Sequence, residues 1–431
     1  MDRLIVRTVS EPIRKTVAVP GSKSITNRAL ILAAMGSHRC DCTLSGALQS
    51  EDTEVMIQAL KQLGFAVDDS RLSEGTIQIP QTHGDVIPAK KADLFLANSG
   101  TSIRFLTALT SLGTGRYRLD GIERMRERPI QDLLDALQSL GVNARSEMDS
   151  GCPPVVVESK GLPGGEVSIR GDVSSQFLSA LLMVAPLTNQ GVQIHVKGEL
   201  VSKPYVEMTT KMMQSFGATV DQIDESSYRI PGQQKYECER YAIEPDASAA
   251  SYFFAAAAIT QGEVTVEGLN ESSLQGDIEF VRALEVMGCE VSMNQGTTCH
   301  WKGSLRGVDL DMNAISDTVM TLGAVACFAD GPTTMRNIGH IRHKETDRLA
   351  AMANELRRIG VRVEEKEDAI TVIPGPMHGA EIETYNDHRM AMSFALIGLR
   401  VPGIVIKDPK CVGKTFPRFF EVLEQVSHGN R

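Results

Sequence analysis

Five predicted amphipathic helices along this chain end in the same way, with a large apolar residue followed by a glycine. The glycines are Gly64, Gly141, Gly217, Gly288 and Gly360, and successive ones lie 77, 76, 71 and 72 residues apart. A glycine just past a helix is explained locally, because the chain turns there through a left-handed conformation that glycine adopts without steric cost. The regular spacing has no local explanation and predicts an internal repeat.

A second type of helix recurs in step with the first and is apolar on nearly all sides. We expect six such helices, at residues 24–35, 101–112, 175–186, 247–259, 317–329 and 388–399. A helix without a polar face is expected to be buried. Short β-rich segments such as Val264–Val266 lie between the helices. Each repeat is therefore predicted to be strand, buried helix, strand, surface helix and two closing strands.

Six such repeats hold too much core for one domain, so we predict an α/β chain of two domains with three βαβαββ repeats each. The last repeat stops after its surface helix, and residues 3–19 are expected to supply its missing strands. The predicted domains are residues 21–241, and residues 1–20 together with 242–431. If the buried helices of each domain run parallel, their N-termini point at a cleft between the domains.

Composition excludes several classes of protein. The net charge of −10 argues against binding nucleic acid or anionic membranes through a basic surface. Eight cysteines are scattered without a CxxC pair or metal-ligand spacing, which favours reduced thiols and no metal site. There is no apolar signal core at the N-terminus, and no apolar run is long enough to cross a membrane. We expect a cytoplasmic monomer whose partners are small molecules.

Cations and hydroxyls gather where the buried helices begin. The segment from Val19 to Arg28 leads through a loop into the first buried helix and carries Lys23 and Arg28 at its start. A helix N-terminus has partial positive charge and unsatisfied N–H groups, so two added cations predict an anion site. Other buried helices begin with comparable residues, which are Gly100, Ser174 to Gln176, Asp317, and Asp387 to Arg389.

Connecting segments add further charge, at residues 124–129, 202–205, 342–348 and 410–414. In the third segment Lys344 and Arg348 are four residues apart, which predicts that they share a helix face with Glu345 beside them.

Each of these positions also has an ordinary interpretation. Helix capping accounts for Ser24, Asn98, Ser174, Asp317 and Asp387, and a solvated turn accounts for Arg124–Arg128. The charged and hydroxyl residues nevertheless recur at the same point of each repeat. Independent surface charges have no reason to recur in phase, so the pattern favours a binding site.

With these segments assembled, the chain closely resembles the 5-enolpyruvylshikimate-3-phosphate (EPSP) synthase family along essentially its whole length. Nine segments in the family's order carry the resemblance: PGSKSITNRAL, LANSGTSIRFL, RMRERPI, GDVSSQFLSALL, LVSKPYVEMT, DASAASYF, KETDRLAAM, YNDHRMAMSF and DPKCVGKTFP. The family implies an inside-out α/β barrel architecture, with two domains of three βαβαββ units that close on the substrates. This agrees with the repeats counted above.

The resemblance implies transfer of the enolpyruvyl group of phosphoenolpyruvate to the 5-hydroxyl of shikimate 3-phosphate, with release of phosphate, in aromatic amino acid biosynthesis. It implies no metal or organic cofactor, and glyphosate as an inhibitor that competes with phosphoenolpyruvate. Both substrates carry a phosphate and a carboxylate. A site for them must neutralise dense negative charge, which the clustered cations fit.

Site residues follow from the matching segments one by one. The resemblance implies that shikimate 3-phosphate is held by Lys23, Ser24, Arg28, Ser174, Ser175, Gln176, Ser202, Tyr205, Asp317, His340 and Lys344. It implies that phosphoenolpyruvate is held by Lys23, Gly100, Arg128, Gln176, Arg348, Arg389 and Lys414. Asp317 resembles the base that accepts the 5-hydroxyl proton. Glu345 resembles the acid that protonates the methylene carbon, with Lys23 as an alternative for part of that proton transfer.

Two positions depart from the family's pattern. His340 stands where asparagine is common, so a different side chain occupies this substrate-contact position. Phe105 follows Arg104 where proline is common, and is expected to shift Thr101 and Arg104 and to alter inhibitor binding.

Two other functions stay open from the sequence. The sister enolpyruvyl transferase that acts on UDP-N-acetylglucosamine has a reactive loop cysteine, whereas residues 116–128 contain none. A noncatalytic protein that binds phosphorylated metabolites would need the cations but neither Asp317 nor Glu345.

Overall fold

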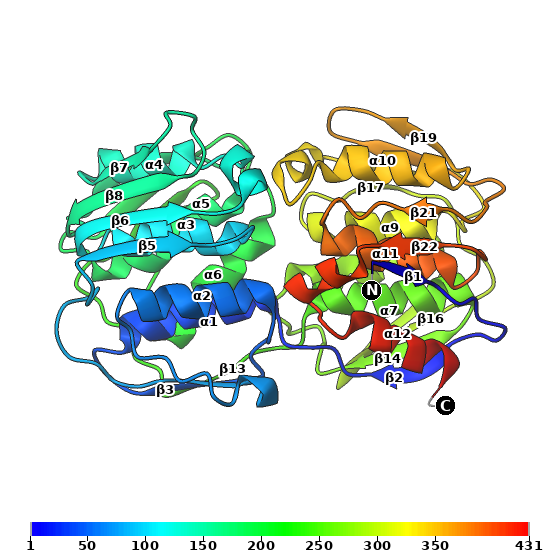
Figure 1. Ribbon diagram of the computed structural model, residues 1–431, viewed down its shortest axis with the longest axis horizontal. Coiled ribbons are helices and arrows are strands. Elements are labelled where there is room, and N and C mark those ends of the chain that lie inside the picture. The colour runs from blue at the N-terminus through cyan, green and yellow to red at the C-terminus, as the bar shows by residue number, and fades with distance from the viewer. Residues whose placement is uncertain (1, 430–431) are drawn as a thin grey trace. The chain divides into compact units, whose positions relative to one another are not determined.

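The computed structural model describes residues 2–429, and the chain divides into two compact units (Figure 1). The continuous unit is Gly21–Ile243. The discontinuous unit is Met1–Pro20 together with Glu244–Arg431. The chain therefore enters the second part of the discontinuous unit after Ile243, whereas the sequence predicted this division after residue 241.

The continuous unit contains mixed sheets that follow the predicted repeat. In the described residues their strand orders are β13-β3-β4, β5-β6-β8-β7 and β11-β12-β10-β9. The strands are β3 (Cys42–Ser45), β4 (Thr76–Ile79), β5 (Lys91–Phe95), β6 (Thr114–Asp120), β7 (Asn143–Ser146), β8 (Val155–Lys160), β9 (Gly165–Arg170), β10 (Val192–Lys197), β11 (Asp221–Asp224), β12 (Ser227–Ile230) and β13 (Arg240–Ala242). Strands β5 and β6 run parallel and β8 returns antiparallel, which is the βαβαββ arrangement.

The discontinuous unit repeats this arrangement. Its sheets have the strand orders β15-β16-β14-β2, β17-β18-β20-β19 and β1-β22-β21. The strands are β1 (Arg3–Ile5), β2 (Arg14–Val17), β14 (Glu263–Glu267), β15 (Glu290–Met293), β16 (Gly296–His300), β17 (Asp309–Asp311), β18 (Thr333–Arg336), β19 (Arg362–Glu365), β20 (Ile370–Ile373), β21 (Glu381–Ile382) and β22 (Val405–Lys407).

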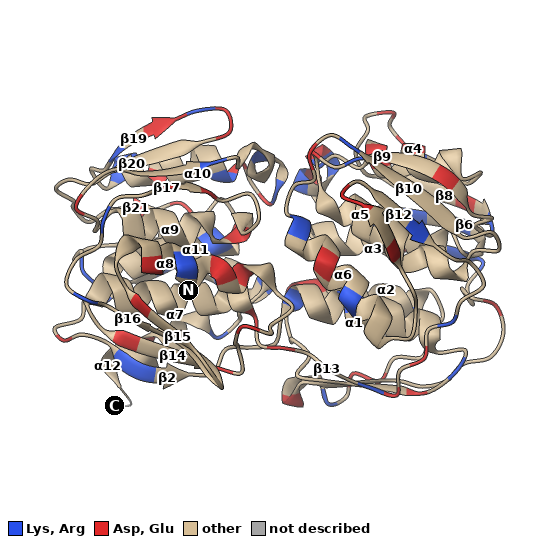
Figure 2. Cartoon of the chain, turned by 180° about the vertical axis from the view of Figure 1, so that it is seen from behind, with Lys and Arg blue, Asp and Glu red and all other residues tan. Residues whose placement is uncertain are grey.

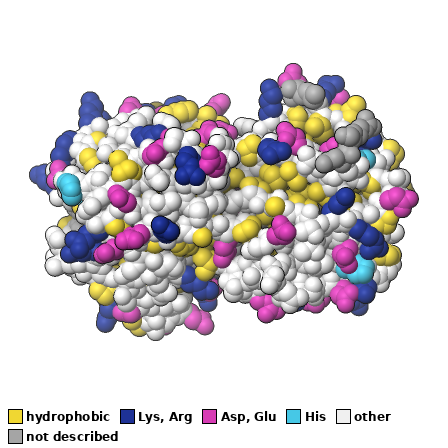
Figure 3. Space-filling view, turned by 90° about the horizontal axis from the view of Figure 1, so that it is seen from below, with side chains coloured by type: hydrophobic (Ala, Val, Ile, Leu, Met, Phe, Trp, Pro, Cys, Tyr) yellow, Lys and Arg dark blue, Asp and Glu magenta, His cyan; other side chains and the backbone are white. Residues whose placement is uncertain are grey.

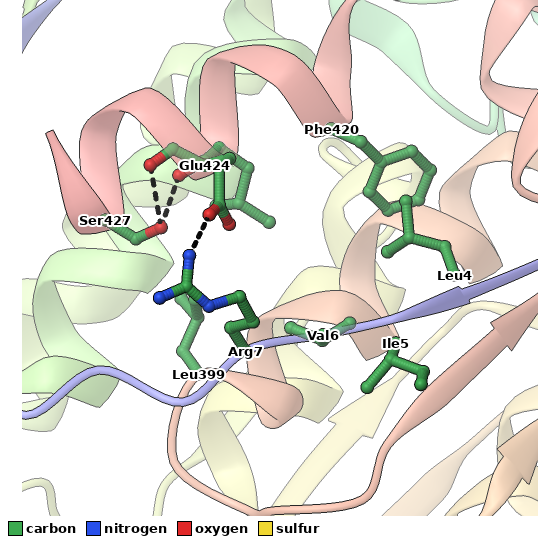
Figure 4. A pocket seen from close by; sticks show the side chains of 9 residues that line it. Leu4, Ile5, Val6, Arg7, Leu399, Phe420, Glu424 and Ser427 are labelled. Carbon is green, nitrogen blue, oxygen red and sulfur yellow. Dashed lines mark hydrogen bonds and ion pairs between the residues drawn. The ribbon is translucent and has the colours of Figure 1, made fainter. Parts of the chain in front are cut away.

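The N-terminal segment completes two of these sheets. Strand β1 runs antiparallel to β22 and so supplies a closing strand to the last repeat, as predicted. Strand β2 runs parallel to β14 and opens the first repeat of the unit. A pocket of about 220 Å³ lies beside β1, and in it Arg7 Nη1 is 2.5 Å from Glu424 Oε1. Figure 4 shows these two side chains pointing toward each other. These two charges pair with each other, and the rest of the lining is mostly apolar, so this pocket has no features of an anion site.

Two sets of helices alternate along the chain. The buried set is α1 (Lys23–Gly36), α3 (Gly100–Thr110), α5 (Ser175–Val184), α7 (Ala247–Thr260), α9 (Val319–Ala326) and α11 (His388–Gly398). The outer set is α2 (Glu51–Gln62), α4 (Gln131–Ser139), α6 (Lys203–Ser215), α8 (Phe280–Met287), α10 (Arg348–Arg358) and α12 (Phe419–His428). Helices α7, α9 and α11 contact one another in the core of the discontinuous unit, and α3 contacts both α1 and α5 in the continuous unit.

Local sequence explains both sets. Every residue of α7 is buried, as expected for a helix that is alanine-rich and apolar on all sides. Each fully buried phenylalanine in it, such as Phe253, contributes about 1.5–3 kcal/mol of hydrophobic stabilisation. The five predicted helix-ending glycines all have a positive φ, between 88° and 116°. The predicted left-handed turns are therefore confirmed.

The start of the fifth buried helix differs from the prediction. Ser316–Thr318 forms a 3₁₀ turn, and the α-helix begins only at Val319. Thr318 occupies the N-cap position without a side-chain capping bond. The interpretation of Asp317 as a helix cap is therefore wrong, and its carboxylate has other partners.

The surface of the molecule carries charges of both signs. On the face shown in Figure 3, acidic and basic side chains are interspersed rather than gathered into one basic patch. Within residues 2–429, every helix is too short or too polar to span a bilayer.

Candidate active site

The buried helices hold very few charged residues, and these are all cations. The Lys, Arg, Asp and Glu residues of the six helices are Lys23, Arg28, Arg104 and Arg389, and all lie within the first two turns (Figure 2). Burying a cation is costly unless a partner or a ligand compensates it. The contacts of each cation therefore indicate what its site can bind.

Lys23 opens helix α1 in the continuous unit. Its Nζ lies 3.2 Å from Asp52 Oδ2, in the first turn of α2. The helix is capped by Ser22, whose hydroxyl accepts from the N–H of Ile25. The interpretation of Ser24 as a cap is therefore wrong, because Ser24 is the second residue of the helix.

Arg28 lies one turn further along α1 and is 1% exposed. Its guanidinium donates to Thr209 Oγ1 at 2.7 Å, Ser24 O at 3.0 Å and Tyr205 O at 3.3 Å. These three acceptors are neutral. Burial lowers the pKa of Arg28 to about 10, and the nearby phenol of Tyr205 opposes this shift only in part. Arg28 is therefore a buried cation whose hydrogen-bond partners in the described part of the chain are neutral.

A second set of contacts joins the start of α3 to α5. Arg104 Nη1 donates to Gln176 Oε1 at 2.7 Å, and Gln176 Nε2 donates to Thr101 Oγ1 at 3.3 Å. Arg128 Nη1 donates to the main-chain oxygen of Asn98 at 2.9 Å and to its side-chain oxygen at 3.2 Å. These side chains surround the first residue of α3, Gly100.

The helix caps of this region are partly as predicted. Ser99, and not Asn98, caps α3, because its hydroxyl accepts from the N–H of Ser102. Ser174 caps α5 as predicted, and Ser175 is the first helical residue. Asn98 instead orients Arg128, which is 3% exposed and so differs from a solvated turn residue.

Ser202 and Tyr205 lie at the start of α6. Ser202 has a left-handed conformation with φ of 52°, and its main-chain oxygen accepts from the N–H of Tyr205 at 3.1 Å. The main-chain oxygen of Tyr205 accepts from Arg28, so this segment lies beside the same cation.

Phe105 has a neighbour that the sequence did not indicate. Its fully buried ring lies against Arg28, with the guanidinium carbon 5.1 Å from the ring centroid. Arg104 packs on a different ring, that of Phe177, at 5.3 Å. The aromatic ring at position 105 thus packs directly against the guanidinium of Arg28.

In the discontinuous unit, three cations surround Asp317. Its Oδ1 accepts from Lys344 Nζ at 2.5 Å and from Arg348 Nη1 at 3.1 Å. Its Oδ2 accepts from Arg389 Nη2 at 2.6 Å. Lys344 follows the 3₁₀ turn Gly339–His343, whereas Arg348 opens α10 and Arg389 lies in the first turn of α11. Three separate elements thus converge on one carboxylate.

This environment fixes the charge of Asp317. Burial raises the pKa of its carboxyl, but the charges of Arg389, Lys344 and Arg348 outweigh burial and hold that pKa well below the usual range. A carboxylate stabilised in this way is a weak base. An anionic ligand that engages the same cations would raise the pKa of Asp317 and make it a better proton acceptor.

Arg348 connects Asp317 to two further carboxylates. Its Nη2 donates to Glu345 Oε2 at 2.7 Å, and its Nε donates to Asp387 Oδ2 at 2.8 Å. Glu345 Oε1 lies 3.5 Å from Lys414 Nζ. Asp387 also caps α11 as predicted, because it accepts from the N–H of Arg389.

Lys344 and Arg348 meet at Asp317, but not for the predicted reason. Lys344 ends the 3₁₀ turn, and Asp347 caps α10, so the two cations do not share a helix face. They converge because the chain turns between them.

His340 lies half-buried in the same 3₁₀ turn. Burial and the charge of Lys344 lower the pKa of its imidazole to about 3, although Asp317 opposes this shift. His340 is therefore neutral at physiological pH and offers one N–H donor and one ring-nitrogen acceptor.

The chain matches one protein family over nearly its whole length. A family model described as EPSP synthase (3-phosphoshikimate 1-carboxyvinyltransferase) matches residues 8–423. The chain belongs to the EPSP synthase family. Among the relatives, a protein of Nostoc punctiforme named 3-phosphoshikimate 1-carboxyvinyltransferase is 49% identical over 431 residues, covering 99% of this chain and 100% of the relative. A protein of Shewanella loihica with the same name is 47% identical over 425 residues, covering 97% of this chain and 98% of the relative.

Solved structures agree on the fold. EPSP synthase from Acinetobacter baumannii superposes with a TM-score of 0.81 at 24% sequence identity, covering 99% of this chain and 98% of that chain. The predicted fold class, an α/β protein built from βαβαββ units in the inside-out arrangement, is confirmed.

Several residues of this EPSP synthase family member that support the site were not predicted. Asp52 pairs with Lys23, and Tyr252 Oη accepts from Arg389 Nη1 at 3.5 Å. Asp52 looks in the sequence like an ordinary acidic residue of a first helical turn, and Tyr252 looks like core. Thr209 ends one of the nine matching segments, and this position was the only signal that could have marked it.

Among residues 2–429, no three or more His, Cys, Asp or Glu side chains are grouped so as to bind a metal ion.

Proposed function

We propose that this EPSP synthase family member transfers the enolpyruvyl group of phosphoenolpyruvate to the 5-hydroxyl of shikimate 3-phosphate and releases phosphate. The observation that carries the proposal is the cluster around Asp317, in which a carboxylate expected to act as a base contacts three cations and shares one of them, Arg348, with a second carboxylate, Glu345. A protein that only binds phosphorylated metabolites needs such cations but no acid and base.

The continuous unit supplies most of the contacts to shikimate 3-phosphate in this proposal. These contacts are Lys23, Ser24, Arg28, Ser174, Ser175, Gln176, Ser202 and Tyr205. Arg28 supports the assignment, since its partners within the chain are neutral and leave its charge for an anionic substrate. Asp317, His340 and Lys344 of the discontinuous unit complete the set. A neutral His340 can donate or accept one hydrogen bond, as an asparagine side chain can.

Phosphoenolpyruvate is proposed to bind cations of both units. From the continuous unit these residues are Lys23, Gly100, Arg128 and Gln176, and from the discontinuous unit they are Arg348, Arg389 and Lys414. Gly100 supports the assignment because a Cβ there would overlap the guanidinium of Arg128. The guanidinium of Arg128 can thus lie close to the backbone of Gly100.

The proposed reaction is an addition followed by an elimination. Glu345 donates a proton to the methylene carbon of phosphoenolpyruvate, which makes its second carbon electrophilic. The 5-hydroxyl adds to that carbon while Asp317 takes its proton. The resulting tetrahedral ketal phosphate then loses phosphate, and a proton leaves the methyl carbon to restore the double bond.

Substrate binding prepares both groups for these steps. Phosphate and carboxylate oxygens of phosphoenolpyruvate would draw Arg348 and Arg389 away from Asp317, which raises the basicity of Asp317. Lys414 and Arg348, which contact Glu345, would likewise turn toward the substrate anions. Lys23 is the alternative donor, and its partner Asp52 keeps it oriented.

The experiment is an assay of phosphate release from phosphoenolpyruvate by the purified chain. Phosphate should appear with shikimate 3-phosphate present, and not with either substrate alone. Release with UDP-N-acetylglucosamine as the acceptor would favour the sister transferase. Tight binding without release would favour a noncatalytic protein.

The working environment is part of the same proposal. All eight cysteines are free thiols, as expected for a protein of the cytoplasm. A monomer is sufficient, because one chain carries every proposed contact.

A further inference from the structure

We infer that Thr209 and Phe105 are positioning residues for Arg28, holding its guanidinium in the orientation that receives an anionic group of shikimate 3-phosphate. Neither residue is among the proposed substrate contacts, and both act through Arg28. The inference rests on the proposed function, because it takes Arg28 to be a contact to that substrate.

The hydrogen bonds of Arg28 leave a defined part of it for a ligand. A guanidinium has five N–H donors. Three of them are used, one from Nε to Thr209 Oγ1, one from Nη1 to Ser24 O, and one from Nη2 to Tyr205 O. One N–H remains on each terminal nitrogen. Two such donors match two oxygens of a carboxylate or phosphate.

The charge of Arg28 is not balanced by the chain. Among residues 2–429, no carboxylate lies within ion-pair distance of Arg28, although its side chain is almost fully buried. An acidic partner would hold the guanidinium in place by charge. Without one, its orientation depends on neutral neighbours, and these are the residues that the inference names.

Thr209 is the neighbour with the shortest contact, and it joins three helices. Its hydroxyl is fully buried on α6, accepts from Arg28 Nε of α1 and lies 2.8 Å from Tyr205 O. It also lies 3.1 Å from Ser179 Oγ of α5. The hydroxyl therefore fixes the Nε edge of Arg28 and, at the same time, the main-chain oxygen that accepts from Nη2.

Phe105 restrains the guanidinium by packing. Its ring centroid lies 5.1 Å from the guanidinium carbon of Arg28, and that of Tyr205 lies 5.9 Å away. A cation over an aromatic ring is attracted by the electrons of the ring face. Phe177 makes the corresponding contact with Arg104 at 5.3 Å, and Arg104 contacts Gln176 instead. The two phenylalanines therefore form a matched pair.

The first test compares Thr209→Val with Thr209→Ser. Valine keeps the shape of threonine but removes the acceptor, whereas serine retains it. In Thr209→Val the KM for shikimate 3-phosphate should rise at least about tenfold, because a hydrogen bond to a charged group commonly contributes that factor. The KM for phosphoenolpyruvate should change less than about twofold. In Thr209→Ser both KM values should stay near those of the wild type. A general loss of structure would instead lower the melting temperature and change both KM values together.

The second test replaces each of the two phenylalanine rings in turn. Phe105→Leu should raise the KM for shikimate 3-phosphate about threefold to tenfold, as expected for the loss of a partly desolvated cation–π contact. Phe177→Leu removes an equally buried ring that lies beside Arg104 and not beside Arg28, so it should raise the KM for shikimate 3-phosphate less than Phe105→Leu does. If both substitutions raise this KM equally, Phe105 has no specific effect on Arg28.

Binding of shikimate 3-phosphate by calorimetry separates this inference from the proposed function. If the wild-type chain binds this substrate but releases no phosphate with phosphoenolpyruvate, the proposed function fails, and weaker binding by Thr209→Val still supports the role of Thr209. If the wild-type chain turns over and Thr209→Val has wild-type affinity and KM for shikimate 3-phosphate, the inference is wrong. Absence of any binding by the wild-type chain would overturn both.

Discussion

At Asp317, the cations that keep the carboxylate ionised also oppose its action as a base. Replacing Asp317 by alanine should lower kcat by about 10²–10⁴, the usual contribution of a general base. The affinity for phosphoenolpyruvate should not fall, because Lys344, Arg348 and Arg389 then no longer share the Asp317 carboxylate with the substrate. Steady-state kinetics and calorimetry test this, with the exposed Asp309→Ala as control. Turnover near the wild-type value would remove Asp317 from the mechanism.

Gly100 is the residue whose lack of a side chain matters most to the site. In Gly100→Ala the new Cβ would overlap Arg128 Nη2 and lie 2.8 Å from Arg104 Nη1, so Arg128 must move. The KM for phosphoenolpyruvate should rise about tenfold or more, and inhibition by glyphosate should weaken. Gly331→Ala is the control, since nothing lies within 4 Å of a Cβ there. Equal inhibition constants for wild type and Gly100→Ala would show that the ligand does not approach this residue.

His340 makes the stability of the fold depend on pH. Its pKa is lowered to about 3 in the folded chain, mainly by burial, while an unfolded histidine titrates near about 6.5. The unfolded state therefore takes up a proton first as pH falls, and stability is lost below about pH 6.5. In His340→Asn this loss of stability should be absent, because asparagine does not take up a proton in this pH range. Between pH 7 and 5.5 the free energy of unfolding of the wild type should fall by about 1 kcal/mol more than that of the variant, measured by urea denaturation. If the free energy of unfolding falls equally with pH in the wild type and in His340→Asn, the imidazole of His340 is not held neutral in the folded chain.

At the scale of the element, the helix-ending glycines define the repeat. Gly141 has φ of 88° and an open position for a Cβ, so Gly141→Ala tests backbone strain alone. Its expected cost is about 1 kcal/mol in the free energy of unfolding. Gly64→Ala should cost more, because its Cβ would also lie 2.8 Å from Pro88 Cβ. Equal losses of unfolding free energy in Gly141→Ala and Gly64→Ala would mean that Pro88 moves away from the new Cβ at position 64.

Repeated elements could be predicted from the sequence because their signals are local. Apolar periodicity and helix-ending glycines both lie within short segments. Counting the repeats then shows that the last one lacks its closing strands. The caps were less predictable, since Ser22 and Ser24, or Asn98 and Ser99, are chemically equivalent candidates one or two residues apart. The cluster at Asp317 required tertiary structure, because its partners come from segments more than 25 residues away. The contact of Phe105 with Arg28 likewise joins two helices whose relative placement the sequence does not specify.

For the whole molecule, the two units provide different electrostatic environments for one pair of substrates. In the continuous unit Arg28 is a cation with neutral partners, whereas in the discontinuous unit Lys344, Arg348 and Arg389 share carboxylates. Under the proposed function, a substrate anion would be a counter-charge for Arg28 and would displace a carboxylate from the cations of the discontinuous unit. The first contact would serve binding, and the second would also make Asp317 a better base.

The most direct measurement is the stoichiometry of transfer. The wild-type chain is incubated with phosphoenolpyruvate and shikimate 3-phosphate, phosphate is quantified, and the sugar phosphate is followed by mass spectrometry. One molecule of shikimate 3-phosphate carrying an added enolpyruvyl group should appear for each phosphate released, and neither should form with Asp317→Ala. Phosphate released while the mass of shikimate 3-phosphate stays unchanged would mean simple hydrolysis, and would contradict enolpyruvyl transfer by this chain.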